Sequence, residues 1–340
     1  MNRETLISHL QPDIQAIDQY LEKECKNISS PSLREIIQYT LFNGGKRIRP
    51  VLTILSSRLC VFARMPENVA EEDELHPPEN LYRLATVFEL IHAASLLHDD
   101  VLDNAENRRG KRATNKVWNN SQAILAGDHL HTIAMYLAGK LVPQRIFNQI
   151  SQTLQDMIEA EFLQIQISET INLAEESYFA VLKGKTGGLI GTACEAGGRF
   201  LEADEDQCAA LRTYGDALGL SFQIIDDLLD FQGNPASTGK ERGSDFRTGR
   251  ITLPLIHALR QAKEEEREGI INLLQSEPEE RLARLDQVID FIDKNGGFAY
   301  TRQGAETLIE AGCSALEVFP DCQAKRSLTA LANYTLSREK

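Results

Sequence analysis

The stretch Leu96-Leu97-His98-Asp99-Asp100-Val101-Leu102-Asp103 decides how the rest of the chain is interpreted. It closes a long apolar run and then presents three carboxylates within five positions. Asp99 and Asp103 stand four residues apart, so on a helix both carboxylates lie on one face. Like charges held this close repel, and carboxylate oxygens suit the hard cations Mg²⁺ and Mn²⁺. The stretch therefore predicts an apolar helix whose end binds a divalent metal together with a phosphorylated ligand.

A second copy of this spacing favours a metal site over an ordinary solvated acidic face. Asp226-Asp227-Leu228-Leu229-Asp230 follows another apolar run, from Leu218 to Ile225. An isolated acidic cluster is most often exposed charge. Two clusters with the same spacing, each at the end of an apolar helix, favour metal binding by both.

Composition excludes several classes of protein. The chain has 340 residues, of which 42% are hydrophobic and 25% charged, as in ordinary globular proteins. Its formal net charge of -14 argues against nucleic-acid binding, which needs clustered Lys and Arg. The N-terminus lacks a signal-peptide pattern, and no run of about 18 apolar residues predicts a transmembrane segment, so we expect a cytoplasmic protein. Six cysteines without paired spacing indicate neither a zinc site nor a disulfide framework.

Nearly every long segment repeats its apolar residues with helical period, and no segment alternates like a strand. Ser30-Pro31 predicts the start of a helix, and Asn43-Gly44-Gly45 predicts its end. The acidic stretch 65–80, with two adjacent prolines, predicts an exposed connector. We therefore expect an all-α fold in a single domain over residues 1–340.

Basic residues cluster at four places that could bind an anion. Lys46-Arg47-Ile48-Arg49 follows a Gly-Gly break at a helix start, which predicts either an anion site or a solvated basic loop. Arg108-Arg109-Gly110 follows the first acidic stretch. Lys185-Thr186 stands among three glycines in a helical pattern, which a kink or the close approach of a ligand would explain. The Gly-, Ser- and Pro-rich segment 232–249, with Lys240, predicts a mobile loop over an active site or a plain surface loop.

Together these motifs resemble those of the trans-isoprenyl diphosphate synthases, the polyprenyl synthetase family. The matching stretches cover nearly the whole chain: Gly44–Pro50, Glu89–Gly110, Ala126–Leu130, Lys185-Thr186, Gly219–Phe231, Gly239–Pro254 and Gly296–Arg338. The resemblance implies a bundle of antiparallel helices around a deep central cavity, the isoprenoid synthase fold, with the two aspartate motifs facing each other across its mouth. It also implies head-to-tail prenyl transfer. An allylic diphosphate ionises, the double bond of isopentenyl diphosphate attacks the cation, and a proton is lost.

The resemblance further implies a role for individual residues and a need for Mg²⁺, two or three ions, with Mn²⁺ as a possible substitute. The metal ligands would be Asp99, Asp103 and Asp226, with support through water from Asp100, Asp227 and Asp230. Isopentenyl diphosphate would be held by Lys46, Arg49, His92 and Arg109. The allylic diphosphate would be held by Arg108, Lys185, Thr186, Gln223 and Lys240. The catalytic set would be Asp99, Asp103, Lys185, Asp226 and Lys240.

Small side chains just before the first acidic motif predict the length of the product. Ala94 and Ser95 lie one turn before Asp99, where side chains tilt into the path of the growing tail. Each buried CH₂ contributes roughly 0.8 kcal/mol, so an open path favours retention of a longer chain. Within the range usual for the family that the sequence resembles, we expect a medium-to-long all-trans product, roughly C30 to C45. Three larger side chains deeper in the bundle are alternative stops: Phe88, Met135 and Tyr136.

Three alternatives stay open beside this hypothesis. A shorter-chain synthase making geranylgeranyl or farnesyl diphosphate would share the fold. A noncatalytic subunit of a heteromeric synthase would be expected to lack an acidic motif or the Arg108-Arg109 pair, and both are complete here. A terpene cyclase would share the first motif, but the second motif and the Lys46/Arg49 pair argue against it. By resemblance we expect a homodimer.

Overall fold

The structure is a computed structural model that describes residues 3–64, 77–233 and 242–338. Within these ranges the chain is helical apart from one short hairpin, so the all-α prediction is confirmed. Most of the predicted connector at 65–80 lies outside the described residues. The elements are α1 (Arg3–Lys26), α2 (Pro31–Phe42), α3 (Ile48–Arg64), α4 (Glu79–Leu102), β1 (Asn107–Arg108), β2 (Lys111–Arg112), α5 (Thr114–Val117), α6 (Asn120–Leu141), α7 (Gln144–Thr170), α8 (Glu175–Leu182), η2 (Lys183–Gly187), α9 (Gly188–Phe200), α10 (Glu205–Gln232), α12 (Ser244–Arg247), α13 (Leu253–Gln261), α14 (Glu264–Leu274), α15 (Pro278–Ala283), α16 (Leu285–Lys294), α17 (Gly297–Ala315), η3 (Leu316–Val318) and α18 (Gln323–Leu336).

Contacts between residues divide the chain into two units. The first lies within Met1–Leu154, Thr192–Arg212 and Leu316–Ala330. The second lies within Gln155–Gly191, Thr213–Ala315 and Leu331–Lys340. The single domain over residues 1–340 stays a prediction. No helix in the described ranges combines the length and the apolar character that crossing a membrane requires.

Local sequence signals set the start and end of α2. The Ser30 side chain accepts a hydrogen bond from the Leu33 N–H at 3.4 Å, and proline follows at the first helical position. After Phe42 the backbone turns through Gly44 (φ +85°) and Gly45 (φ +146°), a region that favours glycine. The predicted start and break of this helix are therefore confirmed, and the break leads into α3.

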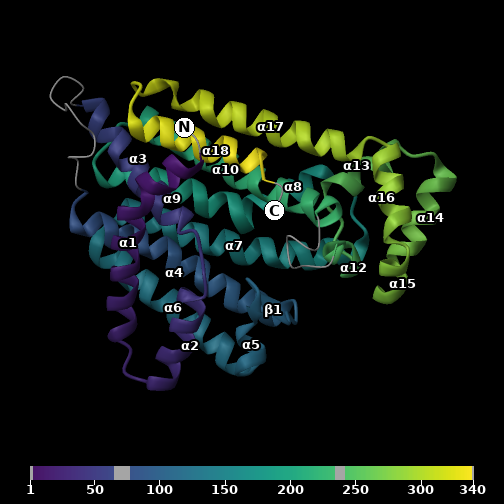
Figure 1. Cartoon of the computed structure of the whole chain (residues 1–340), viewed down its shortest axis with the longest axis horizontal. Coiled ribbons are helices and arrows are strands. Elements are labelled where there is room, and N and C mark those ends of the chain that lie inside the picture. Colours follow the sequence, from purple (N-terminus) through teal and green to yellow (C-terminus); the bar gives the residue numbers. More distant parts are fainter. Residues whose placement is uncertain (1–2, 65–76, 234–241, 339–340) are drawn as a thin grey trace. The chain divides into compact units, whose positions relative to one another are not determined.

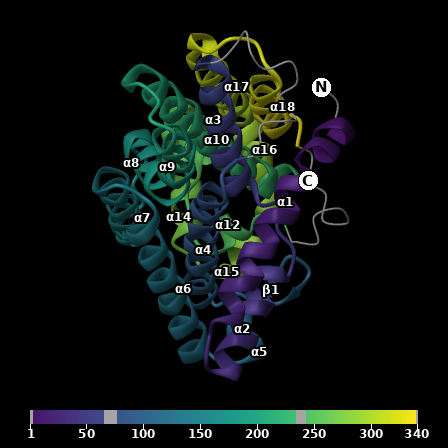
Figure 2. The same cartoon turned by 90° about the vertical axis from the view of Figure 1, so that its left-hand side faces the viewer.

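Helix α4 is the central helix of the first unit. It packs mainly against α6, which runs beside it in both views, and it also contacts α3 and α1 (Figure 1, Figure 2). Its apolar side chains from Leu81 to Leu97 are buried almost without a break. Near its end, Gly127 of α6 lies so close to the His98 ring that a Cβ there would overlap it. The helix is thus fixed along its length, and its C-terminal end carries the first acidic motif.

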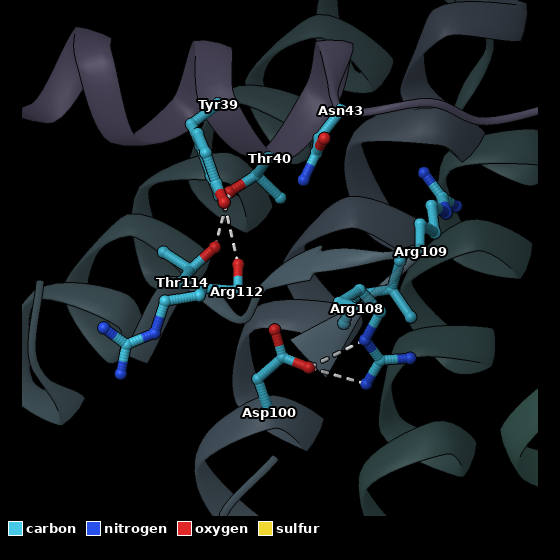
Figure 3. A pocket seen from close by; sticks show the side chains of 9 residues that line it. Tyr39, Thr40, Asn43, Asp100, Arg108, Arg109, Arg112 and Thr114 are labelled. Carbon is cyan, nitrogen blue, oxygen red and sulfur yellow. Dashed lines mark hydrogen bonds and ion pairs between the residues drawn. The ribbon is translucent and has the colours of Figure 1, made fainter. Parts of the chain in front are cut away.

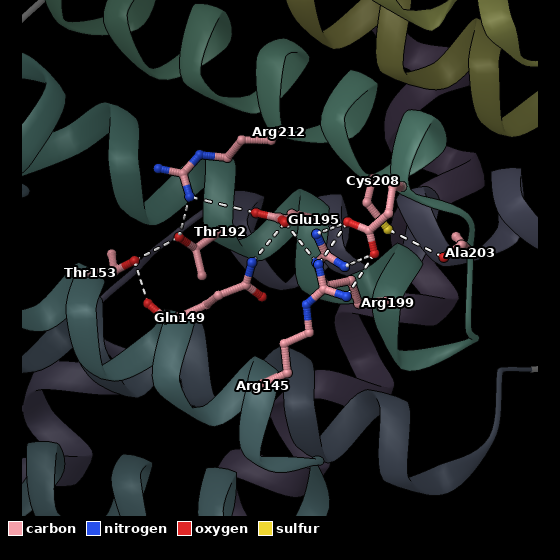
Figure 4. Close-up of polar contacts among 10 residues, drawn as sticks. Arg145, Gln149, Thr153, Thr192, Glu195, Arg199, Ala203, Cys208 and Arg212 are labelled. Carbon is pink, nitrogen blue, oxygen red and sulfur yellow. Dashed lines mark hydrogen bonds and ion pairs between the residues drawn. The ribbon is translucent and has the colours of Figure 1, made fainter.

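A polar network that runs from buried Glu195 to the surface joins α7, α9 and α10 within the first unit. Glu195 accepts hydrogen bonds from Gln149 at 2.8 Å and from Arg199 at 2.7 Å (Figure 4). Arg199 and Arg145 both bind the carboxylate of Glu205, at 2.7 to 3.0 Å. Every charge in the network has an opposite partner, and this pairing offsets part of the cost of burying Glu195.

The second acidic motif belongs to the core of the second unit. The apolar neighbours of its aspartates on α10, Ile225, Leu228 and Phe231, are all buried. They share a hydrophobic core with residues of α13, α16 and α17. Helix α13 packs against α17 and α16, which encloses that core. The apolar face of α10 therefore fixes the helix and leaves the acidic face for other contacts.

Candidate active site

The first acidic motif lies where α4 ends, in the first unit. Helix α4 ends at Leu102, and Asp103 is its C-cap, with its N–H donating to the Asp99 carbonyl at 2.8 Å. Asp99 is half-buried and Asp103 is exposed, whereas Asp100 is buried. The predicted pair at i and i+4 is therefore helical and open to solvent, and the middle aspartate turns inward.

Asp100 binds an arginine of the hairpin. The Nε and Nη2 atoms of Arg108 both lie 2.7 Å from the same carboxylate oxygen of Asp100. The Asn115 side chain donates to the Asp100 carbonyl at 3.0 Å, which holds the backbone of the motif. The sequence predicts that Asp100 supports the metal through water and that Arg108 holds the allylic diphosphate. Either role requires that this ion pair be shared or opened.

The hairpin itself was missed by the sequence analysis. Strands β1 and β2 pair antiparallel, with Asn107 opposite Arg112 and Arg108 opposite Lys111. The two turn residues, Arg109 and Gly110, have φ of +53° and +77°, which matches a two-residue turn of type I′. A glycine at the second position of a tight turn was the available signal. The turn separates Arg109 from its neighbour Arg108, which faces Asp100.

The basic loop before α3 contributes two different kinds of cation. Arg47 is buried and binds Asp18 at 2.8 Å and Glu89 at 2.9 Å, and its third contact is the Leu41 carbonyl at 2.7 Å. Lys46, by contrast, is exposed. Arg47 therefore anchors the loop to α1 and α4, and the predicted phosphate contacts are left to the residues on either side of it.

Two cations, Arg49 and Arg109, lie near the His92 ring in the first unit. Burial, with a further effect of the positive charge on Arg109, lowers the pKa of Arg49 to about 10 despite the opposing charge of Glu89. Burial and the neighbouring arginines hold the pKa of His92 well below its usual value, so its ring is neutral at pH 7. The Nε of Arg49 is buried and has no hydrogen-bond partner among the described residues. A buried donor of this kind is costly unless an acceptor reaches it, and an anion would supply one.

Arg109 connects these residues to the glycine loop. Its Nη1 donates to the Gly44 carbonyl. A Cβ at Gly45 would lie 2.9 Å from Arg47 Nη1 and 3.0 Å from Arg109 Nη1, so a larger residue there would have to displace a guanidinium group. Burial, followed by the charges of Arg47 and Arg108, lowers the pKa of Arg109 while Glu89 opposes the change. The predicted contacts for isopentenyl diphosphate in the first unit thus share one electrostatic environment.

A small pocket lies between the hairpin, α2 and the end of α4 (Figure 3). Its lining residues are Tyr39, Thr40, Asn43, Leu96, Asp100, Arg108, Arg109, Arg112 and Thr114. Tyr39 donates to the Arg112 carbonyl at 2.8 Å, and the hydroxyls of Thr40 and Thr114 lie 3.4 Å apart. With a cavity volume of about 20 Å³, the pocket has room for one water molecule and not for a diphosphate. Its polar lining therefore serves to hold the hairpin against α2.

The three aspartates of the second motif lie in three different environments within the second unit. Asp226 is partly exposed, and its Oδ1 lies 2.7 Å from Arg338 Nη1. Asp227 is buried, and it accepts hydrogen bonds from Tyr178 at 2.7 Å and from Gln223 at 3.0 Å. Burial, and next the nearby charge of Asp245, raises the pKa of Asp227 well above its usual range.

Asp230, the last aspartate of the second motif, caps the short helix α12. Its carboxylate accepts the backbone N–H groups of Ser244 at 3.2 Å and Asp245 at 3.0 Å. These contacts tie α12 to α10. The metal-support role of Asp230 through water stays a prediction. Lys240, the last predicted contact for the allylic diphosphate, lies outside the described residues.

Lys185 and Thr186 lie on a π-helical turn, η2, between α8 and α9. Such turns occur often at functional sites. Lys185 Nζ lies 2.5 Å from Glu161 Oε2 and donates to Gln164 at 2.8 Å, while Thr186 donates to Gln223 at 3.3 Å. The structure thus brings together three predicted residues, Thr186, Gln223 and Asp227, whereas Lys185 faces α7. The partner role of Glu161 was not predicted.

The glycines around Lys185 have a packing explanation. At Gly184 a Cβ would overlap the Ala160 side chain and lie 2.9 Å from the Asp156 carbonyl, so this glycine permits close contact with α7. At Gly219 of α10 a Cβ would lie 2.7 Å from the Gly187 Cα. The sequence offers a kink or the close approach of a ligand; the structure shows a π-helical turn at these glycines and close helix packing around two of them.

The donor groups of the acidic motifs fit a hard divalent metal. Within the described residues no group of three His, Cys, Asp or Glu side chains gathers around one point. Mg²⁺ binds through one or two carboxylates and takes its remaining ligands from water and phosphate oxygens. The exposed Asp103, the half-buried Asp99 and the partly exposed Asp226 suit that coordination.

The residues predicted to set product length differ in burial. Ala94 is fully buried, and Ser95 turns its hydroxyl to the His92 carbonyl at 2.9 Å. Phe88 is fully buried, but Tyr136 is 60% exposed, with Lys140 over its ring. Tyr136 is therefore not part of the packed core of the first unit.

Comparison with known proteins places this geometry in a family. The family model described as Polyprenyl synthetase matches residues 30–292. The octaprenyl diphosphate synthase of Escherichia coli (strain K12) is 31% identical, over 91% of this chain and 90% of that protein. The short chain isoprenyl diphosphate synthase of Methanothermobacter thermautotrophicus is 31% identical, over 95% of each chain. A crystal structure of a decaprenyl diphosphate synthase from Rhodobacter capsulatus covers 100% of both chains, with 32% identity and a TM-score of 0.88. The chain therefore belongs to the polyprenyl synthetase family and is a prenyltransferase.

Proposed function

We propose that the chain condenses isopentenyl diphosphate head-to-tail with an allylic diphosphate and makes a medium-to-long all-trans polyprenyl diphosphate, roughly C30 to C45. One observation carries the proposal. Arg49 keeps a buried donor without a partner beside Arg109 and the neutral ring of His92. This concentration of positive charge stands in a chain whose formal net charge is -14. A diphosphate would satisfy the donor and offset the repulsion among the arginines.

Four residues of the first unit would bind isopentenyl diphosphate. Arg49 stays protonated at neutral pH because its pKa is about 10. Lys46 is exposed next to it and adds a mobile point charge. His92 can hydrogen-bond a phosphate oxygen without adding to the repulsion between Arg49 and Arg109. The four residues therefore bind the diphosphate of the nucleophile and leave its double bond free to react.

The aspartate motifs would act on the allylic diphosphate. We assign Asp99, Asp103 and Asp226 as ligands of Mg²⁺, two or three ions, with Mn²⁺ as a substitute. When bound, the metal would supply Lewis-acid neutralisation of charge on the leaving group. Lys185 would exchange its contact with Glu161 for one with the diphosphate, and Thr186 would position Gln223. The allylic C–O bond breaks with its electron pair leaving on diphosphate, the isopentenyl double bond forms the new C–C bond, and a proton is lost.

Product length is tested by a substitution beside the first motif. Ala94 is fully buried, and Ala94→Phe adds a large ring beside the first motif, where we propose that the growing tail passes. We expect the variant to make a shorter product than the wild type, resolved by reversed-phase chromatography. Ala138→Phe on α6, also fully buried, controls for the general effect of overpacking the core. A folded Ala94→Phe variant with the wild-type product length would contradict the assignment.

The direct test of the reaction uses labelled isopentenyl diphosphate with each allylic primer in turn. We expect Mg²⁺-dependent products of roughly C30 to C45 and no turnover after chelation with EDTA. Products no longer than geranylgeranyl diphosphate would instead support the shorter-chain alternative. No condensation with any primer would support a noncatalytic subunit of a heteromeric synthase.

We also propose that the enzyme acts in the cytoplasm as a homodimer. On α6, the apolar side chains of Ile124, Leu125 and Tyr136 are 41%, 63% and 60% exposed. Such residues on one helix surface are typical of protein contacts. Light scattering coupled to size exclusion should give twice the mass of one 38.0 kDa chain. Leu125→Glu, in the same assay, should give monomers, and an unchanged dimer would exclude this surface.

A further inference from the structure

The last turn of the described chain places a cation on the second acidic motif. Arg338 Nη1 lies 2.7 Å from Asp226 Oδ1, although the two residues are far apart in sequence. The Arg338 side chain is only 12% exposed, and the Asp226 side chain is 37% exposed. Arg338 therefore reaches the motif from beneath the surface, while Asp226 keeps one side open to solvent.

A second contact fixes where the guanidinium lies. The Cζ of Arg338 is 4.2 Å from the centroid of the Phe222 ring, so the side chain lies over that ring. Phe222 precedes Asp226 by four residues on α10, which places the ring and the carboxylate on one face of the helix. Stacking on an aromatic face is a preferred arrangement for arginine. The contact with Asp226 is thus held from two directions.

The hydrogen bonding of Arg338 is incomplete. Its Nε and Nη1 are buried, and neither makes a well-angled hydrogen bond within the described part of the chain. The contact with Asp226 is therefore an ion pair without the bidentate geometry that makes arginine–carboxylate pairs strong. A pair of this kind can be displaced by a competitor that coordinates the carboxylate directly.

We propose that Arg338 is a built-in competitor for the metal, a cation that pairs with Asp226 until a divalent ion takes its place. The inference rests on the metal role proposed for Asp226. Arg338 and the metal would each neutralise the same carboxylate, so their binding is mutually exclusive. When the metal displaces the guanidinium of Arg338 from the carboxylate, its contact with the Phe222 ring remains. Its unpaired donors can then face the diphosphate that binds together with the metal. The C-terminus thereby couples metal binding to the position of one arginine.

The test measures Mn²⁺ binding to the full chain without diphosphates, by the electron paramagnetic resonance signal of free Mn²⁺. We expect Arg338→Gln to bind Mn²⁺ roughly two- to fivefold more tightly than the wild type, because a partly exposed competing ion pair is lost. Arg338→Lys keeps the charge and should stay close to the wild type. Arg326→Gln removes the same charge from α18, where Arg326 pairs with Asp321 at 2.9 Å, and it controls for net charge. Arg338→Gln with the affinity of Arg326→Gln would overturn the proposal.

Two further measurements keep the outcomes separate. Asp226→Asn should weaken Mn²⁺ binding, and if it does not, the metal role of Asp226 fails independently of Arg338. In the wild type, hydrogen exchange of the backbone over 334–338 should become faster when Mn²⁺ is added, because this segment loses its ion pair with Asp226 and keeps only the contact with Phe222. Unchanged or slower exchange there would refute displacement even if a variant failed to fold.

Discussion

Replacing Arg47 should destabilise the chain because its side chain neutralises a carboxylate that water cannot reach. Both Arg47 and Glu89 are 5% exposed at the side chain, and they lie 2.9 Å apart. In Arg47→Met the apolar stem remains, but Glu89 is buried without a cation and the Leu41 carbonyl loses its donor. Removing one partner of a buried ion pair costs about 3 to 5 kcal/mol. The second partner, Asp18, is 39% exposed and can be rehydrated, so Glu89 dominates the loss.

Thermal unfolding gives the scale of the effect. Unfolding entropy of about 2.1 cal/mol/K per residue amounts to about 0.7 kcal/mol/K for 340 residues. The expected fall in Tm is then about 4 to 7 °C, followed by circular dichroism at pH 7. Arg47→Met with Glu89→Gln removes both charges and should recover more than half of that loss. A fall below about 1 °C in the single variant, or no recovery in the double variant, would refute the reasoning.

Three other perturbations have expected outcomes. Gly184→Ala should lower the free energy of unfolding by about 1 to 3 kcal/mol, measured with urea, because its Cβ would meet the α7 backbone. As a control, Gly304→Ala lies in open space on α17 and should raise the free energy of unfolding by up to about 1 kcal/mol. Burial, and next His98, lowers the pKa of His131 to about 4, so the folded state stays neutral while the unfolded state gains a proton below about pH 6.5. His131→Asn should therefore lose less stability than the wild type as the pH falls from 6.5 to 4. Asp230→Ala should speed hydrogen exchange in α12, at a cost of about 1 kcal/mol, and unchanged exchange would exclude the cap.

Helices could be predicted from sequence because their signals are local. The 3.6-residue period, the Ser30-Pro31 start and the Gly44-Gly45 break each depend on neighbours within one or two turns. The hairpin could not be predicted, because strands of two residues are too short to show an alternating pattern of apolar and polar residues. The available signal was Gly110, a residue typical of tight turns. The aspartate spacing likewise predicted the exposed face of α4, because the same periodicity sets which side chains face water.

Side-chain partners could not be predicted, because they depend on contacts between distant segments. The pair between Lys185 and Glu161 joins η2 to α7, and nothing in either segment selects the other. For the same reason the sequence grouped Arg47 with the other cations of its loop, although its positive φ and its burial turn it toward Glu89. Charge type was readable from sequence, but the direction in which each charge points required the fold.

Burial separates the ion pairs that hold the structure from those that a ligand can open. Arg47 and Glu89 are both almost fully buried, so opening their pair would leave two unsolvated charges. Lys185 and Glu161 are 24% and 21% exposed, and water can take over part of each charge when the pair separates. Asp226 is 37% exposed, so water or a metal ion can reach its carboxylate when the contact with Arg338 opens, although Arg338 itself is only 12% exposed. We propose that an acidic chain that binds diphosphates needs both fully buried and partly exposed ion pairs. The buried pairs hold the structure, and the partly exposed pairs keep cations at the site until a diphosphate takes the place of the carboxylate.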